Sequence, residues 1–134
     1  MSTLRRAFHR AMLVGAGGAV GGVARMLVTV LVPVAAGAPE FAPPLLLAAN
    51  LSGSLLAGFL RGLLEREDRD GAWVDAFLLV GFCGGYTSYS GFVAMAAVGS
   101  PWIVAATLVL CPFAALLGMR LSGGYPARPA GNPR

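Results

Sequence analysis

The sequence predicts an all-α membrane protein with four transmembrane helices, formed by one domain. Hydrophobic residues make up 57% of the 134 residues and charged residues 12%, about half of the roughly 25% found in soluble domains. A soluble fold of this size could not cover its surface with so few charges. Long runs without a charge have the length of membrane spans, and most arginines stand at the ends of these runs.

The first span holds one charge, Arg25, and its apolar run is too long for the hydrophobic region of a signal peptide. The second contains Phe41–Leu60, twenty residues without a charge. At 1.5 Å per residue this run gives about 30 Å of helix, which is the thickness of the hydrocarbon layer. Each of these two runs therefore crosses the membrane once.

The run Ala76–Met119 has 44 residues without a charge and must cross the membrane twice, because as one helix it would measure about 66 Å. The segment Gly99-Ser100-Pro101 supplies the turn between the two crossings. Residues 122–134 are rich in Gly and Pro and are expected to form a disordered tail after a four-helix transmembrane domain at 1–121. The four spans are expected at about residues 11–36, 41–62, 74–98 and 101–121.

Almost all positive charges fall on one side of this predicted arrangement. Residues 61–75 form a charged connector between the second and third spans, which we interpret as a solvated turn. The turns near Gly37 and Gly99 hold no arginine. The positive-inside rule then places both termini in the cytoplasm of a multi-pass cell membrane protein. The arginines concerned are Arg5, Arg6, Arg10, Arg61, Arg66, Arg69, Arg120, Arg128 and Arg134.

Small residues predict where the spans approach one another. Lipid supplies no hydrophobic drive between helices, so helices in membranes associate where small side chains let their backbones come close. Such contacts are expected within the chain and with a second subunit. Glycines four residues apart occur at Gly17/Gly21, Gly18/Gly22, Gly58/Gly62 and Gly81/Gly85.

The third span is predicted to contain a broken helix. Residues 81–92, GFCGGYTSYSGF, replace aliphatic side chains with a glycine pair, small hydroxyl residues and aromatic residues. A break frees carbonyl and amide groups at membrane depth, which is tolerated where protein or a polar cavity satisfies them. Freed carbonyl groups can hold a cation.

Polar side chains in the first two spans are candidates for function. Asn50 and Ser54 lie one helical turn apart, and Asn50 is the only amide side chain in any span. A hydrogen bond between helices is the alternative role for Asn50. Arg25 lies about 14 residues into the first span, where a guanidinium is costly unless it faces water or a partner. We expect it to face a vestibule or a cluster of carbonyl groups.

Three segments, in this order, resemble the motifs of the CrcB/Fluc fluoride channel family. Residues 17–26, GGAVGGVARM, resemble the family's GGxxGAxxRY, and residues 50–54, NLSGS, resemble its NxxGS. Residues 81–92 resemble its GxxGGxTTFSTF. The resemblance covers about residues 17–118, which is nearly the whole membrane part.

The resemblance implies a passive, fluoride-selective channel that exports fluoride accumulated from HF and so lowers its toxicity. It implies an antiparallel, dual-topology dimer with two pores. A structural sodium ion, which is not transported, would bind backbone carbonyl groups at the positions of Gly84 and Thr87 at the dimer centre. Arg25 would line a vestibule.

Fluoride is compact and strongly hydrated, so a pore must replace its water shell with hydrogen-bond donors. The amide of Asn50 and several hydroxyl groups are such donors. The rings of Tyr89 and Phe92 present positively charged edges, and these residues match the family's paired pore phenylalanines. Thr107 is matched through its distance from Gly118. The implied pore residues are Asn50, Ser54, Ser88, Tyr89, Ser90, Phe92 and Thr107.

The sequence departs from the family pattern at several positions. Tyr89 replaces a phenylalanine, Gly91 a threonine, Leu55 a phenylalanine and Met26 a tyrosine. The one-sided charge also conflicts with a homodimer whose two copies insert in opposite orientations. We therefore hypothesise that this chain inserts in one orientation and pairs with a related subunit of the opposite orientation, which would make a heterodimer. The homodimer implied by the resemblance stays open as the alternative.

Other function classes have less support in the sequence. A small multidrug-type transporter would need a carboxylate inside the membrane, and no Asp or Glu lies inside a predicted span. An enzyme is not expected, because His9, the single histidine, has no nucleophile or metal partner at useful spacing. A non-conducting partner subunit of a fluoride channel stays open. Cys83 and Cys111 are interpreted as small buried thiols.

Overall fold

The chain is all-α and has four helices that are long and apolar enough to cross a membrane, as the sequence predicted. The computed structural model describes residues 3–31, 43–67, 72–97 and 101–123. The four membrane-length helices are Thr3–Leu31, Pro44–Glu65, Ala72–Ala94 and Pro101–Leu121.

The first span consists of α1 (Thr3–Met26) and a short π-helix, η1 (Leu27–Leu31). Helix α1 begins at Thr3 rather than near residue 11, because the segment TLRRAFHR contains good helix formers and neither Gly nor Pro. Arg10 Nη2 lies 2.9 Å from Asp75 Oδ2, at the start of the third span. This ion pair joins the first span, about two turns after its start, to the third span.

The second span, α3 (Pro43–Glu67), continues beyond the apolar run that predicted it. Arg61 Nε donates to Glu65 Oε1 at 2.9 Å, an i,i+4 pair that supports the last turns of the helix. The part of the charged connector up to Glu67 is therefore helical and not a turn. Residues 68–71 lie outside the described residues.

The third span is divided into short helical segments. These are α4 (Ala72–Val74), the π-helix η2 (Asp75–Cys83), α5 (Gly84–Tyr86) and α6 (Tyr89–Ala97). Between α5 and α6, Thr87 has an extended backbone with φ −74° and ψ 153°. The π-helix η2 was not predicted from the sequence. Such helices are rare and often occur near functional sites.

The fourth span, α7 (Pro101–Leu121), contains Pro112 in its interior and ends on Gly123, whose positive φ of 73° suits a glycine. Ser122 is only 4% exposed, and its hydroxyl donates to Met119 O at 2.7 Å. A Cβ on Gly62 would overlap this hydroxyl. Ser122 thus belongs to the packed part rather than to the tail predicted from residue 122, and residues 124–134 are outside the described residues.

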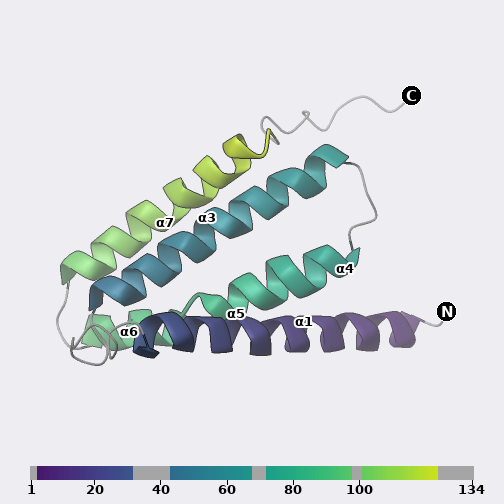
Figure 1. Cartoon of the computed structure of the whole chain (residues 1–134), viewed down its shortest axis with the longest axis horizontal. Coiled ribbons are helices and arrows are strands. Elements are labelled where there is room, and N and C mark those ends of the chain that lie inside the picture. The colour runs from purple at the N-terminus through teal and green to yellow at the C-terminus, as the bar shows by residue number, and fades with distance from the viewer. Residues whose placement is uncertain (1–2, 32–42, 68–71, 98–100, 124–134) are drawn as a thin grey trace.

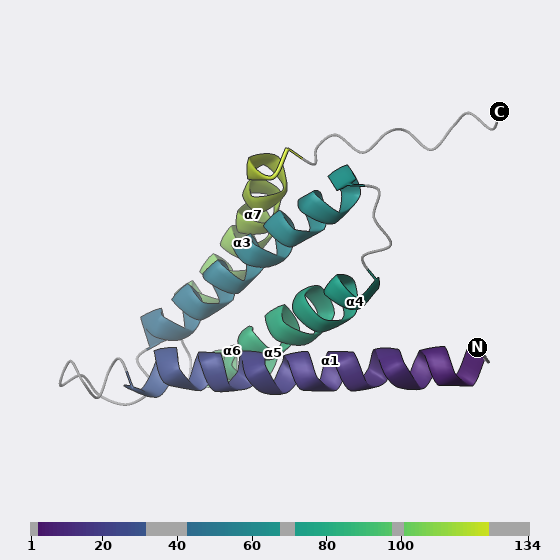
Figure 2. The ribbon, with the colours of Figure 1, turned by 45° about the vertical axis from the view of Figure 1, so that its right-hand side comes forward.

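The spans form two parallel pairs, the first with the third and the second with the fourth (Figure 1). Within each pair both helices run in the same direction. The pairs approach each other at the end where α6 lies and diverge toward the end that carries the N-terminus, as Figure 2 shows from a second direction. Spans that follow one another in the sequence contact each other much less than the two members of a pair do.

Glycines make the contact between the first and third spans. A Cβ on Gly17 would overlap the Phe77 carbonyl oxygen, and one on Gly21 would overlap that of Phe82. From the other side, a Cβ on Gly85 would overlap the carbonyl group of Gly18. The predicted close packing is therefore present within the chain.

The second and fourth spans meet in the same way. A Cβ on Gly58 would overlap the Ala115 carbonyl group, and a Cβ on Gly118 would overlap that of Leu55. Gly22 differs, because a Cβ there would meet nothing within 4 Å. Within the described residues, the spacing of glycines predicted the contact faces except at this position.

Candidate functional site

The candidate site is a cavity of about 340 Å³ between the second, third and fourth spans. It brings together residues from three segments that are distant in the sequence. Seven of the predicted site residues line it, namely Asn50, Ser54, Thr87, Ser88, Tyr89, Phe92 and Thr107, and Leu108, Cys111 and Pro112 complete the wall.

Asn50 connects the second span to the interruption of the third. Its Oδ1 accepts a hydrogen bond of 2.8 Å from Ser88 N, and both residues are buried, with exposed fractions of 6% and 5%. Because the oxygen is engaged, the amide offers its two N–H groups as donors at the cavity wall. Asn50 therefore makes the hydrogen bond between helices that was its alternative role, and it also lines the cavity.

Ser88 caps the N-terminus of α6. Its Oγ accepts a hydrogen bond of 3.0 Å from Gly91 N, and its carbonyl group accepts one of 3.2 Å from Phe92 N. Ser90 Oγ lies 3.4 Å from Ser88 Oγ. The Ser88 hydroxyl therefore has one lone pair engaged, and its own hydrogen is left for Ser90 or for a group in the cavity.

The side chains of Asn50 and Ser88 change the backbone hydrogen bonding where the third span is interrupted, because each accepts a hydrogen bond from a backbone amide. In a continuous α-helix, Ser88 N would bond to the carbonyl group of Gly84, and Gly91 N to that of Thr87. Here Asn50 Oδ1 and Ser88 Oγ accept from these two amides. The contact made to Gly84 O by Thr87 Oγ1 is long, at 3.5 Å. Two carbonyl groups are thus available to a donor or a cation.

A metal ion at this interruption would depend on such carbonyl oxygens. Among the residues that the structure describes, no group of three or more His, Cys, Asp or Glu side chains is placed to hold a metal. Gly84 is exposed, and a Cβ there would meet nothing within 4 Å, so its backbone is accessible. The residues present therefore fit a cation that binds backbone oxygens.

The α3 helix supports the interruption along one more turn. Ser52 Oγ lies 3.2 Å from Tyr86 Oη, and Thr87 Oγ1 donates to Cys83 O at 2.9 Å. A Cβ on Gly53 would lie 2.6 Å from Thr87 Cγ2, so glycine is needed where the two spans cross. Sequence analysis did not identify Ser52 or Tyr86, although both stand inside the motifs.

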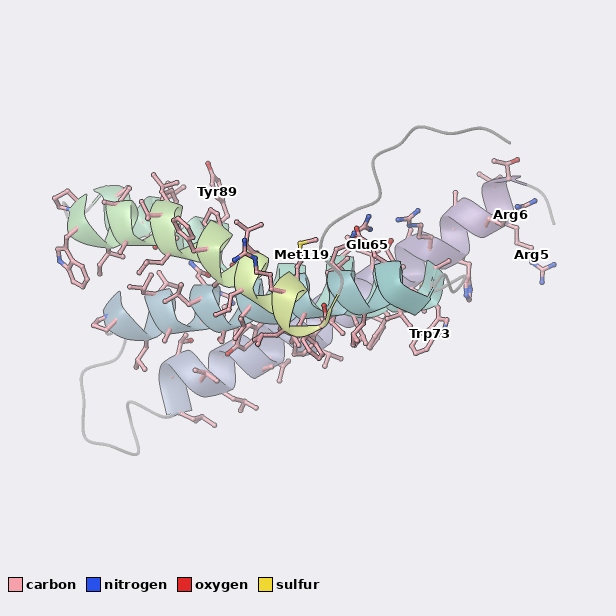
Figure 3. All side chains as sticks on the ribbon, turned by 90° about the horizontal axis from the view of Figure 1, so that it is seen from above. Arg5, Arg6, Glu65, Trp73, Tyr89 and Met119 are labelled. Carbon is pink, nitrogen blue, oxygen red and sulfur yellow. The ribbon has the colours of Figure 1, made fainter. Side chains whose placement is uncertain are left out.

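Two aromatic rings form the outer part of the cavity wall. Tyr89 and Phe92 are stacked, with ring centroids 6.0 Å apart and an interplanar angle of 27°. Tyr89 is 80% exposed and projects away from the helices (Figure 3). The two rings share one face of α6, as their spacing predicted.

The fourth span contributes Thr107 together with residues that sequence analysis did not assign to the site. Cys111 follows Thr107 by one helical turn and is half-buried, not a fully buried thiol like Cys83. Pro112 has no N–H, so the carbonyl group of Leu108 loses its partner within the helix. The i,i+4 spacing from Thr107 to Cys111 was the signal that could have identified this wall.

Three predicted residues lie outside the cavity wall. Ser90 contacts the wall only through Ser88, and Gly84 lies on the exposed side of the interruption. Arg25 is partly buried near the end of α1, and its Nε is shielded from solvent without a hydrogen-bond partner in the described part of the chain. Thr29 Oγ1 donates to Arg25 O at 2.9 Å.

The match to a known protein family covers the three motifs found in the sequence. The family model described as "CrcB-like protein, Camphor Resistance (CrcB)" matches residues 12–119. The chain belongs to this CrcB family. The matched segment overlaps all four spans, and the resemblance inferred from the motifs is confirmed. No solved structure matches the chain.

Curated relatives of this CrcB chain carry the name "Fluoride-specific ion channel FluC". One from Chlorobium phaeobacteroides (strain BS1) is 38% identical over 82 residues, which is 61% of this chain and 62% of the relative. One from Rhizobium meliloti (strain 1021) is 42% identical over 81 residues, 60% of this chain and 63% of the relative. The chain thus spans about three fifths of the length of the curated relatives it matches.

Proposed function

We propose that this chain forms a fluoride-selective channel that passively exports fluoride from the cytoplasm. The observation that carries the proposal is the cavity, where the buried amide of Asn50 and the hydroxyl groups of three residues converge beside two aromatic rings. Membership of the CrcB family supports it, as do the names of the relatives. The hydroxyl residues are Ser54, Ser88 and Thr107.

The chemistry of the cavity suits a small, strongly hydrated anion. Removing the water shell of such an ion is costly unless other donors replace the water, and charge-assisted hydrogen bonds are the strongest available. Asn50 supplies donors that are already oriented by its bond to Ser88. The positive edges of Tyr89 and Phe92 add weaker attraction without a formal charge, so an anion is stabilised and can still leave.

We further propose that the break of the third helix at Thr87 and Ser88 serves the function of the protein. A structural sodium ion would bind at this break, between two subunits in opposite orientation. The extended backbone of Thr87 and the two displaced helical hydrogen bonds support this. Gly84 and Thr87 would provide the carbonyl oxygens. The sodium ion would supply positive charge that fastens the dimer, and it would not be transported.

Arg25 is proposed to line the vestibule through which fluoride reaches the cavity. Its partly buried guanidinium has an Nε without a partner among the described residues, and such a group favours the approach of an anion. Export needs no energy source in this proposal, because HF that enters from an acidic medium dissociates in the cytoplasm and leaves fluoride at higher concentration there.

A second candidate is a partner subunit that inserts in one orientation and conducts only beside a related chain of the opposite orientation. The observation that favours it is charge: the described arginines apart from Arg25 stand on one side, at the N-terminal end of α1 and the C-terminal ends of α3 and α7. If Ser2→Cys were labelled from both sides of the membrane in whole cells, this candidate would be wrong. A multidrug-type transporter finds no support in the family match.

The decisive experiment is fluoride efflux, read by a fluoride electrode, from liposomes that contain this purified chain alone. Fast efflux of fluoride without chloride efflux is expected for a self-sufficient channel. Absence of efflux that is restored by co-expression of a related chain would instead support the partner subunit. Absence of efflux under both conditions would refute a role in fluoride conduction.

A further inference from the structure

The α3 helix contacts the third span on both sides of its interruption. Asn50 Oδ1 accepts a hydrogen bond of 2.8 Å from Ser88 N, directly after the extended residue Thr87. Ser52 Oγ lies 3.2 Å from Tyr86 Oη, directly before it. Two residues of α3 that stand two positions apart thus hold the two neighbours of Thr87.

The direction of the second contact follows from the hydrogens available. Ser52 Oγ donates its single hydrogen to Ala49 O at 3.2 Å, so the hydroxyl of Tyr86 is the donor to Ser52. Ser52 stands near the middle of the span Pro44–Glu65, where the hydrocarbon layer offers a hydroxyl group no other partner. An unpaired phenol hydroxyl is costly at this depth, and this cost stabilises the contact.

The ring and the backbone of Tyr86 are also closely packed. The ring stacks on that of Phe82, with centroids 5.9 Å apart and an interplanar angle of 8°. A Cβ on Gly53 would lie 3.0 Å from Tyr86 Cδ1, and a Cβ on Gly21 would lie 2.8 Å from Tyr86 N. Tyr86 is the last residue of α5, so these contacts and its hydroxyl together fix the point at which the helix stops.

We propose that the hydrogen bond from Tyr86 to Ser52 is a positioning contact that orients the amide of Asn50, and its effect on transport rests on the proposed function. With Tyr86 held, one extended residue brings Ser88 N to Asn50 Oδ1, and the amide N–H groups remain as donors for the cavity. Without this contact, Ser88 N is free to return to the carbonyl group of Gly84, as in a continuous helix. The Asn50 amide then rotates freely and presents its oxygen, which repels an anion.

Fluoride efflux from liposomes tests the effect on transport. Tyr86→Phe keeps the ring and removes the donor, and Ser52→Ala removes the acceptor. Each should lower efflux about fivefold, the effect of one ordinary hydrogen bond, and the double variant should lower it no further. Ser52→Thr keeps the hydroxyl group on an exposed position and should restore efflux. Equal efflux of the Ala and Thr variants, or additive losses in the double variant, would contradict the proposal.

Amide hydrogen exchange, followed by nuclear magnetic resonance of the ¹⁵N-labelled full chain in detergent, separates positioning from stability. Tyr86→Phe should raise the exchange rate of the Ser88 amide about fivefold and shift the side-chain amide signals of Asn50. The Gly58 amide, in the contact of α3 with α7, is the control and should keep its rate.

The outcomes distinguish the positioning contact from the proposed function. Faster exchange at Ser88 and Gly58 alike would mean a general loss of stability and would refute the positioning role. Unchanged exchange at Ser88, in a chain whose wild type transports fluoride, would refute it as well. Faster exchange at Ser88 alone, in a chain whose wild type transports no fluoride, would support the positioning of Asn50 and refute the proposed function.

Discussion

Asn50 and Ser88 are joined by a hydrogen bond of 2.8 Å from Ser88 N to Asn50 Oδ1, although 38 residues separate them in the sequence. The bond replaces the one that Ser88 N would make to Gly84 O in a continuous helix. One side chain therefore stabilises the interruption of the third span and also presents its own donors to the cavity. Substitutions at this pair separate the two roles.

Asn50→Asp should abolish most fluoride efflux while preserving the fold. The carboxylate keeps an oxygen for Ser88 N but loses the N–H donors and adds a negative charge. Loss of a hydrogen bond to a charged partner, about 1.5 to 3 kcal/mol, corresponds to a decrease of roughly tenfold or more in efflux. Leu56→Ala, on the same helix but exposed and outside the cavity wall, is the control. Full efflux through Asn50→Asp would show that the amide is not a donor to the ion.

Ser88→Ala should lower the thermal stability of the chain as well as its conductance. The substitution removes the cap on Gly91 N, which costs about 1 kcal/mol, together with one hydroxyl group of the cavity. Ser88→Thr keeps both groups and should restore most of the stability, measured by thermal unfolding in detergent. Equal unfolding temperatures of the Ala and Thr variants would contradict the capping role.

Gly21→Ala should disrupt the contact between the first and third spans. A Cβ there would overlap the Phe82 carbonyl oxygen and would lie 2.8 Å from Tyr86 N, both parts of a backbone that cannot move independently. Gly22→Ala is a matched control one residue away, with nothing within 4 Å, and should be neutral or stabilise the helix by up to about 1 kcal/mol. Unfolding temperatures and monodispersity in detergent distinguish the two variants.

Cys111 should be accessible to small thiol reagents from the cavity, because it is half-buried in the wall, whereas Cys83 is buried and does not line the cavity. Modification by a methanethiosulfonate reagent should block fluoride efflux by filling the cavity. Cys111→Ser should conduct and resist the reagent. A reagent that reacts at Cys111 without reducing efflux would place the cavity outside the ion pathway.

Removing the ion pair between Arg10 and Asp75 should have a small effect on stability. The arginine side chain is 64% exposed and the aspartate 26%, and such pairs contribute about 0 to 1 kcal/mol. A double-mutant cycle with Arg10→Gln and Asp75→Asn should give a coupling energy below about 1 kcal/mol that decreases at high salt. A larger, salt-independent coupling energy would mean that the pair is desolvated in the membrane.

The sequence predicted the number of spans because uncharged runs of one membrane thickness leave few alternatives. Several residues that the sequence singled out also line the cavity, since Asn50, Ser54 and the 81–92 segment carry polar groups where a plain span would be aliphatic. The contacts of Gly17 and Gly21 followed from the same reasoning about close backbones.

Other features depend on geometry that side-chain patterns do not reveal. The π-helix η2 arises from a shift of backbone hydrogen bonds by one residue, and after Asp75 its residues give no polar signal that would mark this shift. The length of α1 was underestimated, because the charges of Arg5 and Arg10 end the apolar run without ending the helix. The position of Cys111 in the cavity wall follows from that of Thr107, one helical turn earlier on α7, and no sequence motif indicated it.

The parallel pairing of the spans has a consequence for how the chain is made. The first span contacts the third, and the second contacts the fourth, so the partner of each early helix is separated from it by a complete crossing. Because the chain is synthesised at about 5 to 20 residues per second, the first helix stays in the lipid for several seconds before the third span packs against its glycine face. During biogenesis, substitutions on that face should therefore reduce the yield of assembled protein before they alter any property of the finished protein.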